Sequence, residues 1–252
     1  MQDRPPALVT LHVFGVPRRA VGSAVLHMAL DRRPLRTARG LRFAKLLGTG
    51  AGRTFTLRDA DPRHWAVLAA WEHDDDARAF ESSATITGWR RRSEEYLRLA
   101  LRPLRSQGAW SGRQPFGSPR GARWDGPVAA LTRARVRQSR GRAFWAAVPR
   151  VNEALHGTPG LRLAIGIGDA PLVLMGTFSV WASADDLRRF AYGTPEHRDV
   201  IRRTRETGWH VEDLFARFGV LEAVGRLHGR ELSVGTADRV PTGGVAAAKG
   251  VG

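Results

Sequence analysis

Apolar and polar residues alternate over several short stretches of the chain, which is the pattern of half-buried β-strands. In the first part of the chain this alternation predicts strands at residues 8–14, 41–47, 65–71 and 97–104. Apolar residues at helical spacing predict helices at residues 21–30, 74–82 and 89–96. The predicted order is therefore strand, helix, strand, strand, helix, strand.

The same order recurs in the second part of the chain. Strands are predicted at residues 128–136, 161–167, 172–181 and 214–220, and helices near residues 142–155, 185–190 and 196–207. The run "GLRFAKLLGTG" at residue 40 has a counterpart in "GLRLAIGIGDA" at residue 160. An offset of about 110–120 residues is too long for a solenoid repeat and suits a duplicated small domain.

This arrangement predicts an α+β fold made of two tandem ferredoxin-like βαββαβ repeats, packed sheet to sheet so that each covers the other's bare face. The first repeat spans residues 1–107 and the second residues 128–231. Residues 108–127 are rich in glycine and proline and are expected to be a linker. Residues 232–252 lack periodicity and are expected to be a disordered tail.

The apolar segment at residues 163–182 has the length of a bilayer-crossing helix. Gly166, Gly168, Asp169 and Pro171 interrupt it, so two buried strands joined by a turn are the better interpretation. The N-terminus shows no basic head followed by an apolar run, and a cytoplasmic location is expected.

Charge and composition restrict the function. The net charge of +16 is typical of nucleic-acid or anionic-membrane partners, but it comes almost entirely from arginine, with lysine only at Lys45 and Lys249. This bias weakens the inference, and nucleic acid is not the expected partner. The absence of cysteine excludes thiolate nucleophiles, thiolate-bound haem and cysteine-bound iron–sulfur clusters.

The segment "TPEHRDVIRRTRETGW", residues 194–209, predicts a helix that begins after Thr194 and ends near Gly208. His197 falls on its apolar stripe, whereas the arginines fall on other faces. The positive end of the helix dipole keeps an imidazole in the first turn neutral, as a metal ligand must be. A core histidine bonded to a carbonyl group is the open alternative.

Other motifs are weaker. The glycine-rich runs at residues 48–55 and 166–171 lack parts that nucleotide-binding loops require. Residues 73–75 ("HDD") and 210–212 ("HVE") each offer part of a non-haem iron site, which needs two histidines and a carboxylate. Hydrolytic motifs are absent from the sequence.

Two long runs, "GLRLAIGIGDAPLVLMGTFSVW" and "FAYGTPEHRDVIRRTRETGWHVEDLFARF", together with "GTGAGRTFT", "PVAALTRARV" and "FWAAVP", resemble the spheroidene monooxygenase family. The resemblance implies a haem-dependent oxygenase that introduces a keto group into a linear carotenoid by successive hydroxylation, with electrons from reduced ferredoxin. It also implies the dimeric α+β barrel fold, and His197 as the iron ligand.

The site that this resemblance suggests combines three kinds of residue. Phe178, Trp181 and Trp209 are expected to line an apolar tunnel between the sheets, and Arg203 and Arg217 to pair with haem propionates. Glu196 or Asp199 is expected to orient the His197 ring, and Tyr192 is the rival iron ligand.

Several questions stay open at this point. A carotenoid dissolved in a membrane would give the basic surface a peripheral role at the inner membrane face. Homo-oligomerisation is open too. The two alternative functions are a haem-free barrel oxidase acting on another apolar natural product, and a basic nucleic-acid-binding ferredoxin-like protein.

Overall fold

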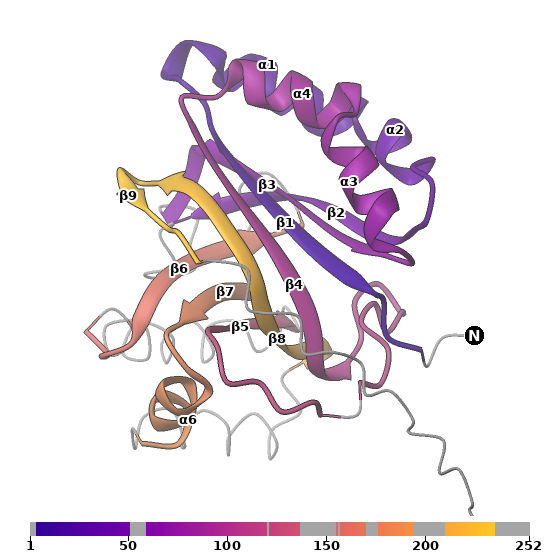
Figure 1. Ribbon diagram of the computed structural model, residues 1–252. Coiled ribbons are helices and arrows are strands. Elements are labelled where there is room, and N and C mark those ends of the chain that lie inside the picture. Colours follow the sequence, from indigo (N-terminus) through magenta and orange to yellow (C-terminus); the bar gives the residue numbers. More distant parts are fainter. Residues whose placement is uncertain are drawn as a thin grey trace, which may run out of the picture.

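Antiparallel strands form a closed barrel that is the centre of the molecule (Figure 1). The structure is a computed structural model, and it describes residues 4–50, 59–119, 121–136, 155, 157–169, 176–193 and 210–234. Eight strands close the barrel, because β4 and β8, at opposite ends of the strand order, also pair with each other. The fold class is therefore α+β, as the sequence predicted.

The described strands are β1 (Leu8–Gly15), β2 (Leu41–Gly50), β3 (Ala60–Trp71), β4 (Glu95–Gly108), β5 (Val128–Val136), β6 (Leu161–Gly168), β7 (Gly176–Trp181), β8 (His210–Leu227) and β9 (Arg230–Glu231). The described helices are the short 3-10 helix η1 (Arg18–Ala20) and the α-helices α1 (Val21–Leu30), α2 (Arg32–Arg36), α3 (Asp74–Glu81), α4 (Ala84–Arg92) and α6 (Ala184–Gly193).

Both halves of the barrel use one strand order. The first half runs β4-β1-β3-β2, and the second half, counted from its own last strand, runs β8-β5-β7-β6. The halves meet at two antiparallel seams, β2 with β6 and β4 with β8. The two sheets are thus hydrogen bonded at both edges and form a single barrel within one chain.

Successive side chains of each strand point alternately into and out of the barrel, which gives one inner apolar layer and two outer apolar layers. The inner cluster contains Val9, Leu11 and Val13 of β1 and Phe218 of β8, and side chains fill the interior as expected for eight strands. In the first half, the outer faces pack beneath helices α1 to α4, which lie together on one side of the barrel (Figure 1). In the second half, the outer layer lies beneath α6.

The same contacts recur in the two halves. Trp71 ends β3 and packs on Phe80 of α3, with ring centroids 5.0 Å apart. Trp181 ends β7 and packs on Phe190 of α6 at 5.2 Å. Each pair fixes the helix that follows the third strand of its half.

The β4–β8 seam has the same feature near both of its ends, a glycine with positive φ that lies against the backbone of the other strand. Gly225 of β8 has φ +119°, and a Cβ there would lie 2.1 Å from the carbonyl oxygen of Tyr96. Gly108 of β4 has φ +95°, and its Cβ would lie 2.3 Å from the carbonyl oxygen of Asp213. A glycine is therefore required near each end of the seam, because any side chain would separate the two strands.

Most predicted elements are confirmed, and one is wrong. The strand β5 has the predicted bounds. The predicted helix at residues 89–96 is instead α4 up to Arg92, after which Ser93 is extended and β4 begins at Glu95. Residues 95 and 96 are strand rather than helix because they pair with β1, where Tyr96 lies opposite Phe14. The predicted helices at residues 142–155 and 196–207 lie outside the described residues, apart from Leu155.

The segment expected to be a linker packs on the barrel. Trp110 and Phe116 are buried within the inner cluster, and the Phe116 ring meets that of Phe218 edge to face at 4.9 Å. At the other end of the second half, Val234 pairs with Ala223 and is buried too. The remainder of the expected tail, from residue 235, lies outside the described residues.

None of the helices in the described part of the chain has both the length and the hydropathy needed to cross a membrane. The apolar segment at residues 163–182 forms strands in its described parts, namely most of β6 and all of β7. This agrees with the two strands predicted there.

We expect Gly225→Ala to destabilise the protein by about 2 to 4 kcal/mol, since a methyl group there collides with backbone of the closing strand. Gly22→Ala is the control, because Gly22 lies on α1 with open space around it and should stabilise the helix by about 0.5–1 kcal/mol. Urea unfolding followed by circular dichroism measures both. Equal stability of the Gly225 variant and the wild type would contradict the role given to the seam.

Candidate functional site

Half of the residues predicted to bind a cofactor lie in a part of the chain that the structure does not describe. His197, Arg203 and Trp209 belong to residues 194–209, outside the described residues. The side chain of Tyr192 is outside them too. Iron ligation by His197 accordingly stays a prediction.

The other three residues are described, and they occupy two different layers. Phe178 lies in the inner cluster of the barrel, whereas Trp181 lies in the outer layer beneath α6. The two belong to one strand at an odd spacing, so their side chains point to opposite faces. A tunnel between the sheets cannot include both residues, and that expectation is wrong for Trp181.

Arg217 lies on the same outer face of the barrel as Trp181. Its neighbours Ala216 and Phe218 point into the barrel, so the half-buried Arg217 points outward. It lies opposite Ala130 of β5, which packs in the outer layer together with Trp181. Two of the predicted cofactor contacts thus share the outer face of the second half.

The chain between this layer and β8 is longer than its counterpart in the first half. Leu99 of β4 and Ala216 of β8 hold equivalent places, opposite the fourth residues of β1 and β5. From Phe80 to Leu99 the numbering advances by 19, and from Phe190 to Ala216 it advances by 26. The additional residues fall in the stretch that contains His197.

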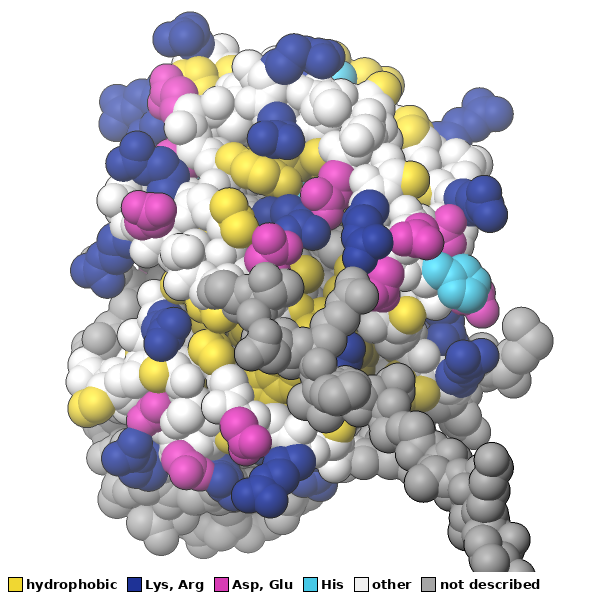
Figure 2. All heavy atoms as spheres, in the orientation of Figure 1, with side chains coloured by type: hydrophobic (Ala, Val, Ile, Leu, Met, Phe, Trp, Pro, Cys, Tyr) yellow, Lys and Arg dark blue, Asp and Glu magenta, His cyan; other side chains and the backbone are white. Residues whose placement is uncertain are grey.

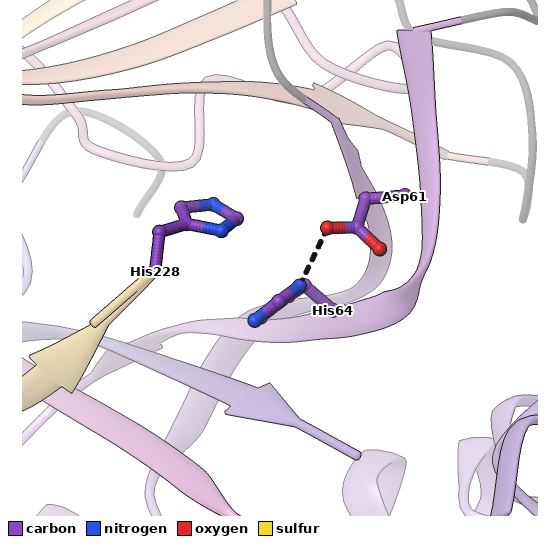
Figure 3. A group of neighbouring side chains, drawn as sticks. All are labelled: Asp61, His64 and His228. Carbon is purple, nitrogen blue, oxygen red and sulfur yellow. Dashed lines mark hydrogen bonds and ion pairs between the residues drawn. The ribbon is translucent and has the colours of Figure 1, made fainter. Parts of the chain in front are cut away.

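The structure assembles a second site, shown in Figure 3, that the sequence interpretation missed. Asp61 and His64 of β3 and His228 of the β8–β9 turn bring one carboxylate oxygen and two imidazole nitrogens within 4.8 Å of one another. The Nδ1 of His64 donates to Oδ2 of Asp61 at 2.6 Å. The rings of His64 and His228 have centroids 4.4 Å apart.

An irregularity in β3 places Asp61 and His64 on one side. Thr49 of β2 pairs with Asp61, but Gly48 pairs with Trp65, so three residues of β3 have no partner on β2. The backbone N–H of Arg63 donates to Oδ1 of Asp61 at 2.9 Å and holds this bulge. Without the bulge, residues three apart would point to opposite faces.

A fourth residue, the acidic Glu95 at the start of β4, holds both the His64 ring and the β8–β9 turn. One of its oxygens lies 3.2 Å from Nε2 of His64 and accepts from the backbone N–H of His228 at 2.8 Å. The other accepts from the N–H of Gly229 at 2.8 Å. His228 and Gly229 have φ of +50° and +73°, which is a tight hairpin turn with two left-handed residues.

The ionisable groups of this cluster influence one another. Burial by itself disfavours the charged ring of His64, but the hydrogen bonds and negative charges of Asp61 and Glu95 outweigh it and raise the pKa of His64. Burial opposes ionisation of both carboxyls, yet the hydrogen bonds they accept lower the pKa of Asp61 and of Glu95. Burial and the neighbouring charge of His64 lower the pKa of His228.

The opposite end of the seam carries the same turn with different chemistry. Ser111 and Gly112 have φ of +56° and +69°, and Glu212 accepts from their backbone N–H groups as Glu95 does at the other end. There the glutamate also accepts from the buried Arg133 at 2.7 Å. Arg133 in turn lies 2.9 Å from Asp169. This end is an arginine–carboxylate network rather than a histidine cluster.

A buried histidine lies under the helices of the first half. His12 of β1 is fully buried, and its Nδ1 lies 2.8 Å from the hydroxyl of Tyr96. Its Nε2 has no hydrogen-bond partner among the described residues. Burial first, and then the positive charges of Arg98 and Arg90, lower the pKa of His12 to about 3. The ring is therefore neutral in the folded protein at ordinary pH.

The described cluster contains neither of the two histidine–carboxylate runs noted in the sequence. His73 lies exposed at the N-terminus of α3, and the side chain of His210 is outside the described residues. The spacing of Asp61 and His64 gave no signal for this cluster, because residues three apart on a regular strand point to opposite faces. His228 joins them only because the barrel closes.

Comparison with known sequences gives a consistent result, although no family model matches the chain. The chain is 38% identical over 210 residues to the spheroidene monooxygenase of Rhodobacter capsulatus, covering 82% of this chain and 87% of the relative. It is 37% identical over 193 residues to that of Rubrivivax gelatinosus, covering 76% and 73%. The Cereibacter sphaeroides enzyme is 32% identical over 192 residues, covering 75% of this chain and 59% of the relative.

Solved structures agree on the fold. An aldoxime dehydratase superimposes with a TM-score of 0.56 at 13% identity, covering 84% of this chain and 80% of the other. The aldoxime dehydratase OxdRE in complex with butyraldoxime gives 0.57 at 11% identity, covering 84% and 79%. At this identity the likeness concerns the barrel alone.

Fold and sequence together define the class of this protein as an oxidoreductase, a monooxygenase built on an antiparallel α+β barrel. Within that class, the chain belongs to the spheroidene monooxygenase family.

The neutral His12 predicts a specific loss of stability in acid. Its folded pKa lies below the unfolded value of about 6.5, so the unfolded chain binds more protons and stability falls as the pH drops from 6.5 towards 3. The loss should approach about 1.4 kcal/mol per pH unit. Urea unfolding at pH 7, 6 and 5 measures it.

The control is His12→Asn, which keeps a polar group on β1 but does not titrate. Its stability should depend less steeply on pH than that of the wild type. Parallel pH profiles would show that His12 does not contribute.

Proposed function

We propose that this chain is a haem-dependent carotenoid monooxygenase that introduces a keto group into a linear carotenoid. The observation that carries the proposal is the 38% identity over 210 residues to a protein named spheroidene monooxygenase, which extends over 87% of that protein. The shared length includes most of the barrel, so the likeness is not confined to one motif.

The outer layer of the second half offers surroundings that suit a haem. A haem needs apolar contact for its ring, a cation for its carboxylates and an axial donor. Trp181, Leu187 and Phe190 form a buried apolar cluster in this layer, and Arg217 points outward from the adjacent β8. The longer connection to β8 contains the predicted donor, His197. When bound, haem would supply the activation of O₂ that hydroxylation of an unactivated carbon requires.

Residues of the chain have distinct tasks in this proposal. His197 would hold the iron, and Glu196 or Asp199 would accept a hydrogen bond from its other ring nitrogen. Arg203 and Arg217 pair with the propionates, and the aromatic rings of Trp181 and Trp209 exclude water from the bound polyene. Phe178, which packs inside the barrel, has no place beside them.

The reaction proposed is two hydroxylations at one carbon. Each inserts one atom of O₂ into a C–H bond, while two electrons and two protons convert the second atom to water. The resulting geminal diol loses water to form the ketone. Reduced ferredoxin is the proposed electron donor, because the chain has no cysteine for a cluster of its own.

A tandem duplication accounts for the two halves. The shared strand order, the two tryptophan–phenylalanine pairs and the self-repeating seam support it. We place the ferredoxin-like repeats at residues 1–107 and 128–231, with residues 108–127 joining them. The tail expected from residue 232 would begin later, because Val234 still pairs with Ala223 and is buried.

The helical side of the first half suits contact with a membrane, where the substrate dissolves. Leu26 and Leu30 of α1 are 57% and 56% exposed, and Val25 is 44% exposed. Exposed arginines border them on both sides, namely Arg18, Arg19, Arg32, Arg33 and Arg36. Elsewhere, on the face in Figure 2, basic and acidic side chains are interspersed. An apolar strip bordered by cations is typical of peripheral helices on anionic lipid.

Removal of the axial donor tests the cofactor. The wild type, expressed with haem precursor, should show a Soret band and convert a linear carotenoid when supplied with reduced ferredoxin. His197→Ala should shift or abolish the band and reduce conversion at least about a hundredfold, as loss of a metal ligand disrupts the centre. His73→Ala, at an exposed histidine, is the control. An unchanged ferric spectrum in His197→Ala would remove His197 from the iron.

Charge insertion tests the membrane contact. The double variant Leu26→Asp with Leu30→Asp should bind vesicles of phosphatidylserine and phosphatidylcholine at least about tenfold more weakly than the wild type, since apolar contact is lost and a like charge meets the lipid. Val224→Asp is the control, because Val224 is 51% exposed on β8. Equal losses in both variants, measured by vesicle sedimentation, would refute a specific surface on α1.

A further inference from the structure

We propose that Asp61, His64 and His228 bind one divalent transition-metal cation of the zinc type, at a site that shares no residue with the proposed haem region. This site lies where the bulge of β3 meets the β8–β9 turn.

The donor atoms have the number and kind that such cations use. Two imidazole nitrogens and one carboxylate oxygen lie within 4.8 Å of one another and face a common point in Figure 3. Zinc sites with three protein ligands commonly use imidazole and carboxylate groups and leave one position for water. The two-histidine, one-carboxylate set also suits other divalent first-row metals.

Neighbouring groups orient the proposed ligands as they do in metal sites. The Nε2 of His64 faces Glu95 at 3.2 Å, which leaves Nδ1, the nitrogen beside Asp61, for the cation. The N–H of Arg63 holds Oδ1 of Asp61 and leaves Oδ2 directed towards the histidines. A ligating histidine usually donates its other nitrogen to a carboxylate in this way.

Internal comparison shows that the turn does not need a histidine. The turn at Ser111 and Gly112 has the same backbone conformation and the same glutamate clamp, with serine in the place of His228. The turn itself requires the left-handed conformation, since Ser111 adopts it as well as His228. In the turn of the β8–β9 hairpin, it directs an imidazole over His64.

The side chain of His228 has no evident structural role among the described residues. Its ring contacts His64 but forms no hydrogen bond within the described part of the chain, and the residue is exposed. His64, by contrast, is 6% exposed. The site is therefore anchored on its inner side and open to solvent on its outer side, where a water molecule or exchangeable ligand would complete the coordination.

Without metal, a proton occupies the place of the cation on Nδ1 of His64, where it bridges to Asp61. Binding displaces that proton to solvent. The cation would then link β3 to the hairpin that follows β8 and stabilise the closed seam, because it joins strands of both halves of the barrel.

Titration of the full-length, chelator-treated protein with Zn²⁺ tests the site, and calorimetry measures how many ions bind per chain. A parallel titration with Co²⁺ reports the kind of ligand through its visible spectrum. The wild type should bind one Zn²⁺ per chain, counted apart from any haem iron by its absorbance. His228→Ser copies the Ser111 turn and so keeps the fold, and it should weaken Zn²⁺ binding at least tenfold. Asp61→Asn, which preserves the hydrogen bond from Arg63, should do the same.

His73→Ala is the matched control, because it removes an exposed histidine that is followed by three aspartates, and it should bind as the wild type does. A wild type that takes up no stoichiometric Zn²⁺ would overturn the proposal. Affinity that is equal in the wild type and His228→Ser, with circular dichroism showing both folded, would overturn it as well.

Discussion

Closure of the barrel between β4 and β8 is the constraint on which the rest of the structure depends. An open eight-stranded sheet would leave two edges with unpaired backbone groups and an apolar face exposed to water. The pairing of β4 with β8 removes both edges, and it requires glycine at Gly108 and Gly225 because the strands approach too closely for a side chain. Each end is then secured by a glutamate that binds the N–H groups of a tight turn.

The two halves of the barrel have the same strand order and equivalent turns, but the polar side chains at those turns differ. The two glutamates, Glu95 and Glu212, hold equivalent turns, yet one faces a histidine pair and the other a buried arginine. The outer layers differ too, because the chain after Phe190 is longer than the chain after Phe80. A stable barrel can carry such differences because its strands are fixed by pairing and core packing, which leaves turns and connections free to vary.

Separate surfaces of one barrel can therefore serve a single oxygenase. In the proposals above, the layer beneath α6 would hold the haem and α1 would contact a membrane, while the seam carries the histidine–carboxylate cluster. Side chains such as Phe178 and Phe218 fill the interior of the barrel.

The sequence by itself determined the order of the described strands and of most described helices, because periods of 2 and 3.6 residues depend only on which face of each element is buried. It also determined the family, because long ordered runs survive as similarity. The helix expected at residues 89–96 failed where pairing with β1 outweighed local periodicity. The odd spacing of Phe178 and Trp181 on one strand already places them on opposite faces. Only the tertiary structure decided which of these faces lies inside the barrel, and that His228 lies beside Asp61 and His64. These results depend on register, a bulge and the closing of the barrel, which are set by contacts between residues far apart in the chain and leave no local pattern.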